Sequence, residues 1–349
     1  MGTLAQFKRP GILDTPSAAT YRRLVLDRPV TCALAAALAA YFAAADARAG
    51  GNDLVTSRLA TIVPGEDRDR VVSDPEAFRS LASELGVVLA PRLSSPADTL
   101  GYGGFEFAAD LSFSTINSGE PYWRARQGYT ADPTGRHGPG VMPTAGLNVR
   151  KGIGFPLPLE LHVGAVHLID SSMWGAQAGL KIAVHEGYHE LPLPSVAVRV
   201  GGNRLMGTDQ IDLSTGSVDV SLSKSFGVAG AVNLQPYGGW NGLFIVPSSG
   251  VIDKTPHIDP RQAGDEALQF SFRQQDPIFR NRLFAGLKLK HYVFAVTFEA
   301  TLALPGNSVD DRPGVSRACS ATTGVTDACN ARDNAGLQQH YAITVATDF

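Results

Sequence analysis

Hydrophobic and polar residues alternate with a period of two along most of the chain, starting at Phe105. The stretch 105–113 is typical, because phenylalanine, alanine and leucine alternate there with Glu106, Asp110 and Ser112. Successive side chains of a strand point to opposite faces, so each such stretch predicts a strand with one apolar and one polar face. Ten stretches follow this pattern, at 105–113, 147–155, 159–165, 174–184, 196–200, 218–222, 228–236, 283–289, 292–302 and 340–349.

The connections between these predicted strands are of two kinds. Tight connections occur at 156–158, 226–227 and 290–291. Long connections, rich in Gly, Pro, Asp and Ser, occur at 117–142, 247–279 and 305–338. Counted back from the C-terminus, the long ones fall on one side of the sheet and the tight ones on the other. A β-sandwich would show the same alternation, but strands of about ten residues with this asymmetry are expected of a transmembrane barrel.

We therefore predict an all-β fold, an antiparallel transmembrane β-barrel preceded by a short helical segment. The strand count of a single-chain bacterial barrel is even. The apolar stretch 86–93 adds a further potential strand to the ten above, and an even count then requires another. The expected number is about 12 strands, with 10 and 14 as alternatives.

The last predicted strand carries a more specific pattern. Residues 340–349 read HYAITVATDF and place Tyr341, Ile343, Val345 and the terminal Phe349 on one face. This resembles the C-terminal signature of Gram-negative outer-membrane β-barrel proteins, a terminal aromatic residue with alternating hydrophobic residues and a second aromatic before it. The residue at 347 is a threonine and departs from that pattern. The resemblance implies a porin-like barrel over 103–349, whose four signature residues are an assembly signal for the barrel assembly machinery.

The chain before the alternating region is organised differently. An alanine-rich run at 30–45 follows three arginines and precedes the small-x-small tripeptide 47–49. This predicts a secretory signal peptide cleaved before Gly50, with a buried alanine-rich helix as the alternative. Residues 75–84 have apolar positions at helical spacing. We therefore divide the chain into a leader and signal peptide at 1–49, a periplasmic arm or plug with a short helix at 50–84, and an outer-membrane barrel at 85–349.

Composition excludes several classes of function. The net charge is -3 and the basic residues are scattered, so we expect no nucleic-acid partner. The mean hydropathy is near zero, which is too polar for a bundle of membrane helices. If the leader is removed, the mature chain keeps Cys319 and Cys329, which predict one disulfide in an oxidising compartment or two free thiols. The expected location is the outer membrane, reached by export and in contact with outer-membrane lipid.

One motif points to catalysis. Residues 185–189 match H-E-x-x-H, in which two histidines one helical turn apart bind zinc and the glutamate is the general base. The chemistry requires a helix, whereas here the motif follows a strand pattern, contains Gly187 and runs into a proline-containing stretch. No G-x-S-x-G elbow is present. We predict a non-enzyme without catalytic residues, metal or cofactor, and a barrel hydrolase is the alternative.

The polar faces of the predicted strands carry charges of both signs. A Lys or Arg facing the middle of the bilayer costs about 2 to 4 kcal/mol, so these side chains are expected to face the lumen. The predicted lumen-lining residues are Glu106, Asp110, Arg150, Glu160, His162, Lys181, Arg199, Asp219, Lys288 and Glu299. Such a lumen suits a channel or transporter for small solutes. The alternative is a non-conducting structural or adhesive barrel, in which the charges pair with one another and long external loops bind partners.

Overall fold

The structure is a computed structural model of the chain. It describes residues 50–66, 69–130, 138–154, 158–187, 193–228, 230–256, 268–272, 276–306 and 333–349. The predicted signal peptide lies outside the described residues, and so do Cys319 and Cys329 of the predicted disulfide.

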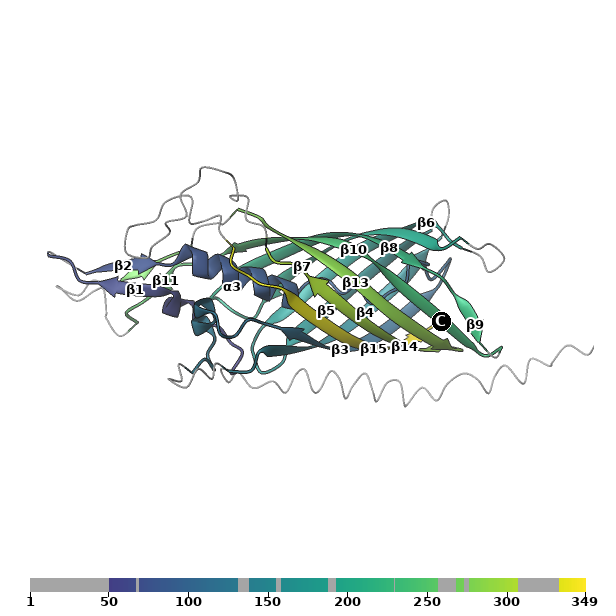
Figure 1. Cartoon of the computed structure of the whole chain (residues 1–349), viewed down its shortest axis with the longest axis horizontal. Helices are drawn as coiled ribbons and strands as arrows, with labels where there is room; N and C mark the ends of the chain where they lie inside the picture. Colours follow the sequence, from purple (N-terminus) through teal and green to yellow (C-terminus); the bar gives the residue numbers. More distant parts are fainter. Residues whose placement is uncertain are drawn as a thin grey trace, which may run out of the picture. The chain divides into compact units, whose positions relative to one another are not determined.

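Ten antiparallel strands form a closed barrel (Figure 1). Each strand pairs with its neighbours in chain order, and the ring closes where the first strand, β3, pairs with the last, β15. The barrel strands are β3 Phe105–Thr115, β4 Val141–Ile153, β5 Leu159–Leu168, β6 Trp174–His185, β7 Ser195–Met206, β8 Asp212–Ser223, β10 Val232–Ser248, β13 Ile278–His291, β14 Phe294–Ala303 and β15 Gln338–Asp348. A short strand, β9 (Phe226–Val228), pairs with the start of β10 and is not part of the ring.

The prediction of about 12 strands is wrong, and the alternative of 10 is confirmed. The error comes from 86–93, which is not a strand. Its first residues complete the helix α3, Pro75–Val88, and the rest is extended chain without strand pairing. A short apolar run fits a buried helix as well as a strand, so periodicity alone could not separate the two. The boundary expected between residues 84 and 85 lies inside this helix, and the barrel wall begins at Phe105.

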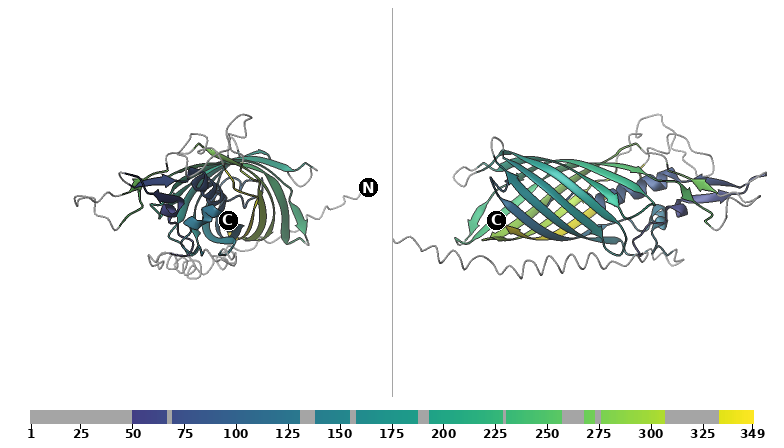
Figure 2. Two further views of the ribbon diagram at one scale, coloured as in Figure 1. Left: turned by 60° about the vertical axis from the view of Figure 1, so that its left-hand side comes forward. Right: turned by 180° about the vertical axis from the view of Figure 1, so that it is seen from behind.

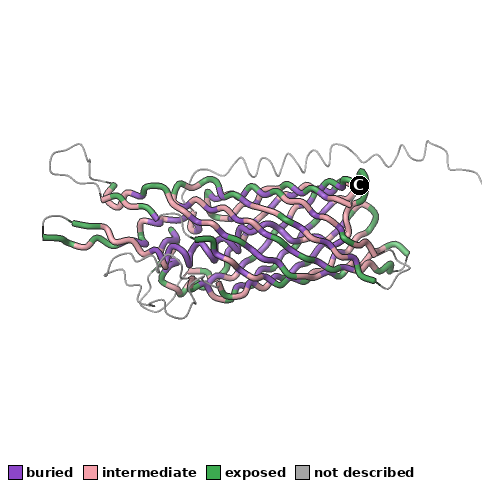
Figure 3. The backbone as a smooth tube through the Cα atoms, turned by 90° about the horizontal axis from the view of Figure 1, so that it is seen from above, coloured by how far each residue is buried: buried purple, intermediate pink, exposed green. Residues whose placement is uncertain are grey.

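Buried and more exposed positions alternate along most of the barrel strands (Figure 3). On β15, Tyr341, Ile343 and Val345 are 47–55% exposed, whereas Ala342 and Thr344 between them are buried. Phe349 is exposed as well. A closed ring satisfies its backbone hydrogen bonds internally, and its exposed outer face is apolar, which together suit it to hydrocarbon.

The two ends of the barrel differ in their connections. At one end, called here the turn end, lie the connections 154–158, 186–194, 224–231 and 292–293. The C-terminus is also there, because Phe349 and Phe105 exchange backbone hydrogen bonds of 2.8 and 2.9 Å. At the other end, called the loop end, lie the connections 116–140, 169–173, 207–211, 249–277 and 304–337. The long connections expected from the sequence are all at the loop end.

The chain before the barrel adds a few small elements. The 3-10 helix η1 (Thr56–Leu59) leads into a hairpin of β1 (Ala60–Val63) and β2 (Arg70–Ser73). The helix α3 begins next, with a proline in its first turn, and its N-cap Asp74 accepts a 3.0 Å hydrogen bond from the amide of Ala77.

Two loop-end connections also carry short elements. They are the 3-10 helix η2 (Pro121–Ala125) and the paired strands β11 (Ile252–Asp253) and β12 (Gln269–Phe270). Among the helices of the described residues, none is both long and apolar enough to span a bilayer.

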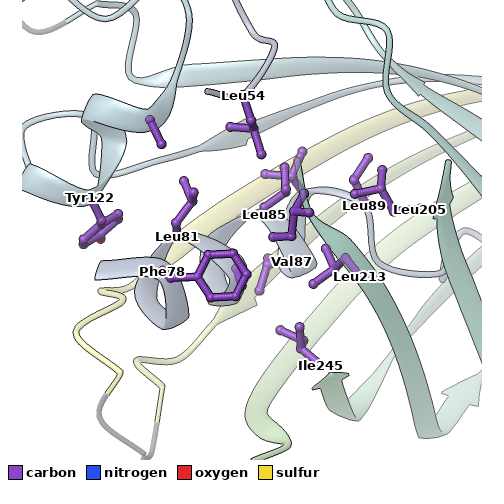
Figure 4. Packing of buried hydrophobic residues seen from close by; sticks show 14 of the residues in the cluster. Leu54, Phe78, Leu81, Leu85, Val87, Leu89, Tyr122, Leu205, Leu213 and Ile245 are labelled. Atoms are coloured by element: carbon purple, nitrogen blue, oxygen red, sulfur yellow. The ribbon is translucent and has the colours of Figure 1, made fainter. Parts of the chain in front are cut away.

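The main hydrophobic core lies around α3 in the loop-end half of the barrel (Figure 4). The helix contributes Phe78, Leu81 and Leu85, which are fully buried. The barrel wall contributes apolar side chains near the loop ends of its strands, among them Met142, Leu168, Leu205, Leu213, Ile245 and Ile278. The inward face of the wall therefore carries an apolar cluster at this end, whereas the sequence pattern alone suggested a polar lumen throughout.

Candidate functional site

Residues 50–104, called here the N-terminal segment, enter the barrel at its loop end. The hairpin β1–β2 lies beyond that end (Figure 2), and the part from α3 onward occupies the lumen. At the loop end, the amide of Asn52 donates to the carbonyl of Asp170 in the β5–β6 connection, at 2.9 Å. Further along, the carbonyl of Leu89 accepts from Asn203 on β7. At the turn end, the hydroxyl of Thr99 donates to Glu186 just after β6, at 2.6 Å. The segment thus runs the length of the barrel from the loop end to the turn end, where it continues into β3.

Helix α3 packs closely against the loop-end part of the barrel wall and against the loop-end connections. The rings of Phe78 and Phe272 are stacked, with centroids 4.2 Å apart. A Cβ added at Gly86 would lie 2.6 Å from Ile245 on β10, so the helix backbone touches the barrel wall. The side chains at 78, 81, 85, 88 and 89 are all fully buried. At about 1.5–3 kcal/mol for each buried side chain, together they stabilise the docked helix by on the order of 10 kcal/mol.

The helix also carries a buried acid. The carboxylate of Glu84 accepts hydrogen bonds from the hydroxyl of Tyr122 at 2.8 Å, the indole N–H of Trp123 at 2.7 Å and the amide of Asn117 at 3.0 Å. Burial raises the pKa of Glu84, and the three donors oppose that shift because they favour the charged form. These bonds fasten α3 to the connection between β3 and β4.

A second polar contact fastens the same helix to the chain just before β15. The hydroxyl of Ser83 donates to Asp333 at 2.7 Å and accepts from Arg280 of β13 at 2.9 Å. Arg280 also donates to the carbonyls of Leu304 and Gly336, both at 2.8 Å. Burial raises the pKa of Asp333, opposed by the hydrogen bond from Ser83. Helix α3 is thus tied to two connections of the loop end as well as to the barrel wall.

All ten residues predicted to line the lumen are buried, each at 9% exposure or less. Several of them form one cluster near the turn end. Glu106 pairs with Arg150 and, at 2.7 Å, with Lys288. Glu160 lies 3.4 Å from Arg150 and 3.0 Å from Lys181. Side chains of opposite charge therefore pair with one another inside the barrel.

The other predicted lumen residues form separate pairs. Arg199 donates to Asp219 at 2.9 Å, and His162 lies 3.0 Å from the side-chain oxygen of Asn148. Glu299 accepts a 2.8 Å hydrogen bond from the hydroxyl of Tyr237. The tenth residue, Asp110, pairs with a residue of the N-terminal segment, described next.

Arg92 of the N-terminal segment binds to three strands of the wall. Its guanidinium is 3.1 Å from Asp110 on β3, donates to Thr144 on β4 at 2.7 Å, and lies 3.4 Å from His340 on β15. Since β3 and β15 are the strands that close the ring, this side chain spans the seam of the barrel from inside.

Charged side chains of the barrel wall also bind the backbone of the N-terminal segment between Arg92 and the turn end. Arg199 donates to the carbonyl of Leu93 at 3.1 Å. The ammonium of Lys181 donates to the carbonyls of Pro96 and Asp98, at 3.1 and 2.9 Å. Glu160 accepts from the amide of Leu100 at 3.2 Å. Residues 89–104 are therefore held along their length by side chains of the barrel.

A small polar hollow lies beside the segment. A hollow of about 20 Å³ lies among Arg92, Glu106, Arg150 and neighbouring polar side chains. That volume is enough for about one water molecule, and it is lined by groups that could bond to it. A solute larger than water does not fit there while the N-terminal segment is in place.

The H-E-x-x-H motif does not form a helical zinc site in the described part of the chain. His185 is the last residue of strand β6, and Glu186 binds Thr99 through both the hydroxyl and, at 3.1 Å, the amide. The rest of the motif, including His189, lies outside the described residues. Among the residues that the structure describes, no group of three or more His, Cys, Asp and Glu side chains could hold a metal ion.

Sequence reasoning overlooked several residues of the lumen. Arg282 donates to Asn241 at 2.9 Å inside the wall. Arg282 lies six residues before Lys288 on β13 and therefore on the same face of the strand. Extending the alternating pattern back to residue 282 would have identified it. Arg92 had no such signal, because it lies in a stretch without periodicity. Tyr237 carries no charge and stands beside two glycines, so nothing in the pattern placed its hydroxyl in the lumen.

No protein-family model and no curated protein matches the chain. Similar solved structures include Neisserial surface protein A, at 10% identity over 71% of this chain and 99% of that chain, with a TM-score of 0.27. Ail, the attachment invasion locus protein of Yersinia pestis, has 12% identity over 71% and 99%, with a TM-score of 0.23. LpxR from Salmonella typhimurium has 11% identity over 68% and 99%, with a TM-score of 0.26.

The molecule itself has a closed ring of ten strands, an apolar outer face and two ends with different connections. By these features the chain is an outer-membrane β-barrel.

Proposed function

We propose that this barrel is non-conducting and acts at the outer membrane as a structural anchor that binds partners at its loop end. The observation that carries the proposal is the occupied lumen. An apolar core around α3 fills one half, and ion pairs around residues 89–104 fill the other. This observation favours the second function considered from the sequence, a non-conducting barrel with a charge-paired interior, over a channel for small solutes.

The packing energy supports a fixed plug over a removable one. Withdrawing α3 would expose its buried side chains, at a cost on the order of 10 kcal/mol by area. Such a difference leaves fewer than about one molecule in a million open at equilibrium, since each 1.4 kcal/mol is a factor of ten. A channel function would need an external agent that supplies this energy.

The partner-binding part of the proposal rests on a polar hollow at the loop end. It has a volume of about 560 Å³ and is open to the surroundings. The N-terminal segment contributes Asp53, and three loop-end connections contribute Gln127, Ser172, Asp209 and Gln210. Carboxylate, amide and hydroxyl groups in one hollow suit a hydroxyl-rich ligand such as a glycan. Binding to a glycan array should fall in a Gln127→Ala/Asp209→Ala variant.

Single-channel recording in planar bilayers tests the closed lumen. The purified barrel is expected to insert, as shown by heat-modifiable gel mobility of the recovered protein, and to stay silent. A variant that lacks residues 50–104 and still shows heat-modifiable mobility is expected to conduct. Reproducible conductance steps from the intact chain would contradict the proposal.

A further inference from the structure

The N-terminal segment has a direction as well as a place. Residues 50–59 contact the connections of the loop end: Asn52 bonds to Asp170 as above, and the amide of Thr56 donates to Gln210 at 3.0 Å. Residues 97–104 are at the turn end, where the amide of Ala97 donates to Ser223, the last residue of β8, at 3.1 Å. The N-terminal segment therefore crosses the full height of the wall once, and β3 then crosses it in the opposite direction.

The two ends of an outer-membrane barrel face different compartments. Short turns face the periplasm and long loops face the outside. On this orientation residues 99–104 are periplasmic and residues 50–73 are outside, although both belong to one continuous segment ahead of the first strand.

We infer that the barrel carries its own N-terminal segment across the outer membrane and displays residues 50–73 at the cell surface. The inference goes beyond a closed lumen, because a plug could equally enter from the periplasmic side and stay there. It follows from the order of contacts along the segment, which pass from the loop end at Asp74 to Asn203 at Leu89 and to the turn end at Leu100.

The displayed part includes a small folded unit. The hairpin β1–β2 pairs Ala60 with Ser73 and Val63 with Arg70. Its base is fixed, because the amide of Asp74 donates to the carbonyl of Leu59 at 2.9 Å and the carboxylate of Asp74 pairs with Arg124 at 3.1 Å. Towards the tip, Ile62 and Arg70 are exposed. The barrel thus presents a hairpin on a fixed base.

The packing also sets the order of events during assembly. A helix with its side chains is about 10–12 Å wide, and the finished lumen below α3 is filled by the ion pairs. The helix and hairpin therefore cannot pass a completed ring. Arg92 contacts both β3 and β15, the two strands whose pairing closes the ring. The wall closes around a segment that has already crossed.

Cysteine labelling on intact cells tests the topology. In a background with Cys32, Cys319 and Cys329 replaced by serine, single cysteines are placed at the two ends of the segment, as Ile62→Cys and Tyr102→Cys. Matched positions in the barrel connections give the reference, as Val251→Cys at the loop end and Tyr292→Cys at the turn end. The native side chains are all exposed, so each site should tolerate the change and react with the reagent. The exposed fractions are 39% for Ile62, 89% for Tyr102, 73% for Val251 and 76% for Tyr292.

With a maleimide too large to cross the outer membrane, Ile62→Cys and Val251→Cys are expected to label as fully in intact cells as after permeabilisation. Tyr102→Cys and Tyr292→Cys are expected to label only after permeabilisation. Protection of Ile62→Cys in intact cells would overturn the inference, whichever way the barrel is oriented. The same readout from a barrel that conducts would refute the closed-lumen proposal and leave the inference standing.

Discussion

The two halves of the lumen hold the same segment in different ways. In the loop-end half, α3 is held by apolar packing against Ile245, Ile278 and their neighbours. In the turn-end half, residues 89–104 are held by hydrogen bonds and ion pairs from charged wall residues such as Lys181 and Arg199. The change of chemistry coincides with the end of the helix at Val88.

Backbone hydrogen bonding explains why the chemistry changes there. A helix satisfies its own N–H and C=O groups, so an apolar wall can surround it. An extended chain does not, and every buried backbone group needs a partner from elsewhere. The wall supplies them, for example Gln177 to the amide of Arg92 at 3.0 Å and Arg199 to the carbonyl of Leu93. The lumen charges therefore serve the backbone of the segment as much as one another.

The largest expected effect comes from removing apolar side chains of the helix. The double variant Phe78→Ala/Leu85→Ala should reduce the free energy of docking α3 by about 5 kcal/mol or more, because Phe→Ala and Leu→Ala in a core cost about 3–5 and 2–5 kcal/mol. Hydrogen exchange of the α3 amides would rise accordingly. Ile62→Ala, in the exposed hairpin, is the control. Unchanged protection of α3 would show that the apolar core does not hold it.

Arg92→Met should cost about 3–5 kcal/mol, because it leaves the carboxylate of Asp110 buried without its partner. Adding Asp110→Leu should restore most of that loss, since replacing both members of a buried ion pair by apolar groups is often neutral. The measurement is chemical unfolding of the barrel in lipid. A double variant no more stable than Arg92→Met would mean that the other contacts of Arg92, to Thr144 and His340, dominate.

The barrel wall could be predicted from the sequence because the direction of a strand side chain is a local property. All ten barrel strands overlap the ten alternating stretches, and the asymmetry of the connections gave the two ends. Helix α3 was expected from its spacing, but its last turn was not, because Gly86 to Val88 fit a strand equally well. Only packing against Ile245 separates the two readings, and packing partners are not visible in a pattern.

The lumen charges could be assigned to the inner face for the same local reason, whereas their partners could not. The pairing of Glu106 with Lys288 joins residues from opposite ends of the barrel sequence, which meet only because the ring closes. The sequence gives no indication that residues 89–104 cross the lumen, because an extended chain without regular secondary structure has no periodic pattern of hydrophobic and polar residues. The direction of that crossing is likewise a property of the closed barrel.

Glu84→Gln should weaken the docking of α3 by about 1–3 kcal/mol, because the amide NH₂ of glutamine would face one of the three donors that now meet a carboxylate. A pH dependence should disappear with it. Burial raises the pKa of Glu84 above its ordinary 4.5, so the folded chain binds this proton more tightly than the unfolded chain. The stability that Glu84 contributes is therefore fullest at low pH and is lost as pH rises through the folded pKa.

Exchange of the α3 amides, corrected for intrinsic rates, measures this effect. The intact chain should lose protection of α3 as the pH rises above 4.5, and Glu84→Gln should show a flatter profile. Ser80→Ala offers a control on the same helix, because it removes a hydroxyl that accepts from Asn334 and has no charge to titrate. An unchanged pH profile in Glu84→Gln would assign the dependence to another group, such as Asp333.

The smallest effect is expected at the exit of the segment. Thr99→Val removes the hydroxyl that donates to Glu186 at 2.6 Å but keeps the shape of the side chain and the amide bond to the same carboxylate. The loss should be about 1 kcal/mol, and Thr99→Ser should recover it. Because the two halves are held by different forces, exchange should rise around Thr99 and Gly101 and remain unchanged in α3. If α3 loses protection to the same extent, the segment opens as a single unit, and the apolar half does not hold the helix independently of the ionic half.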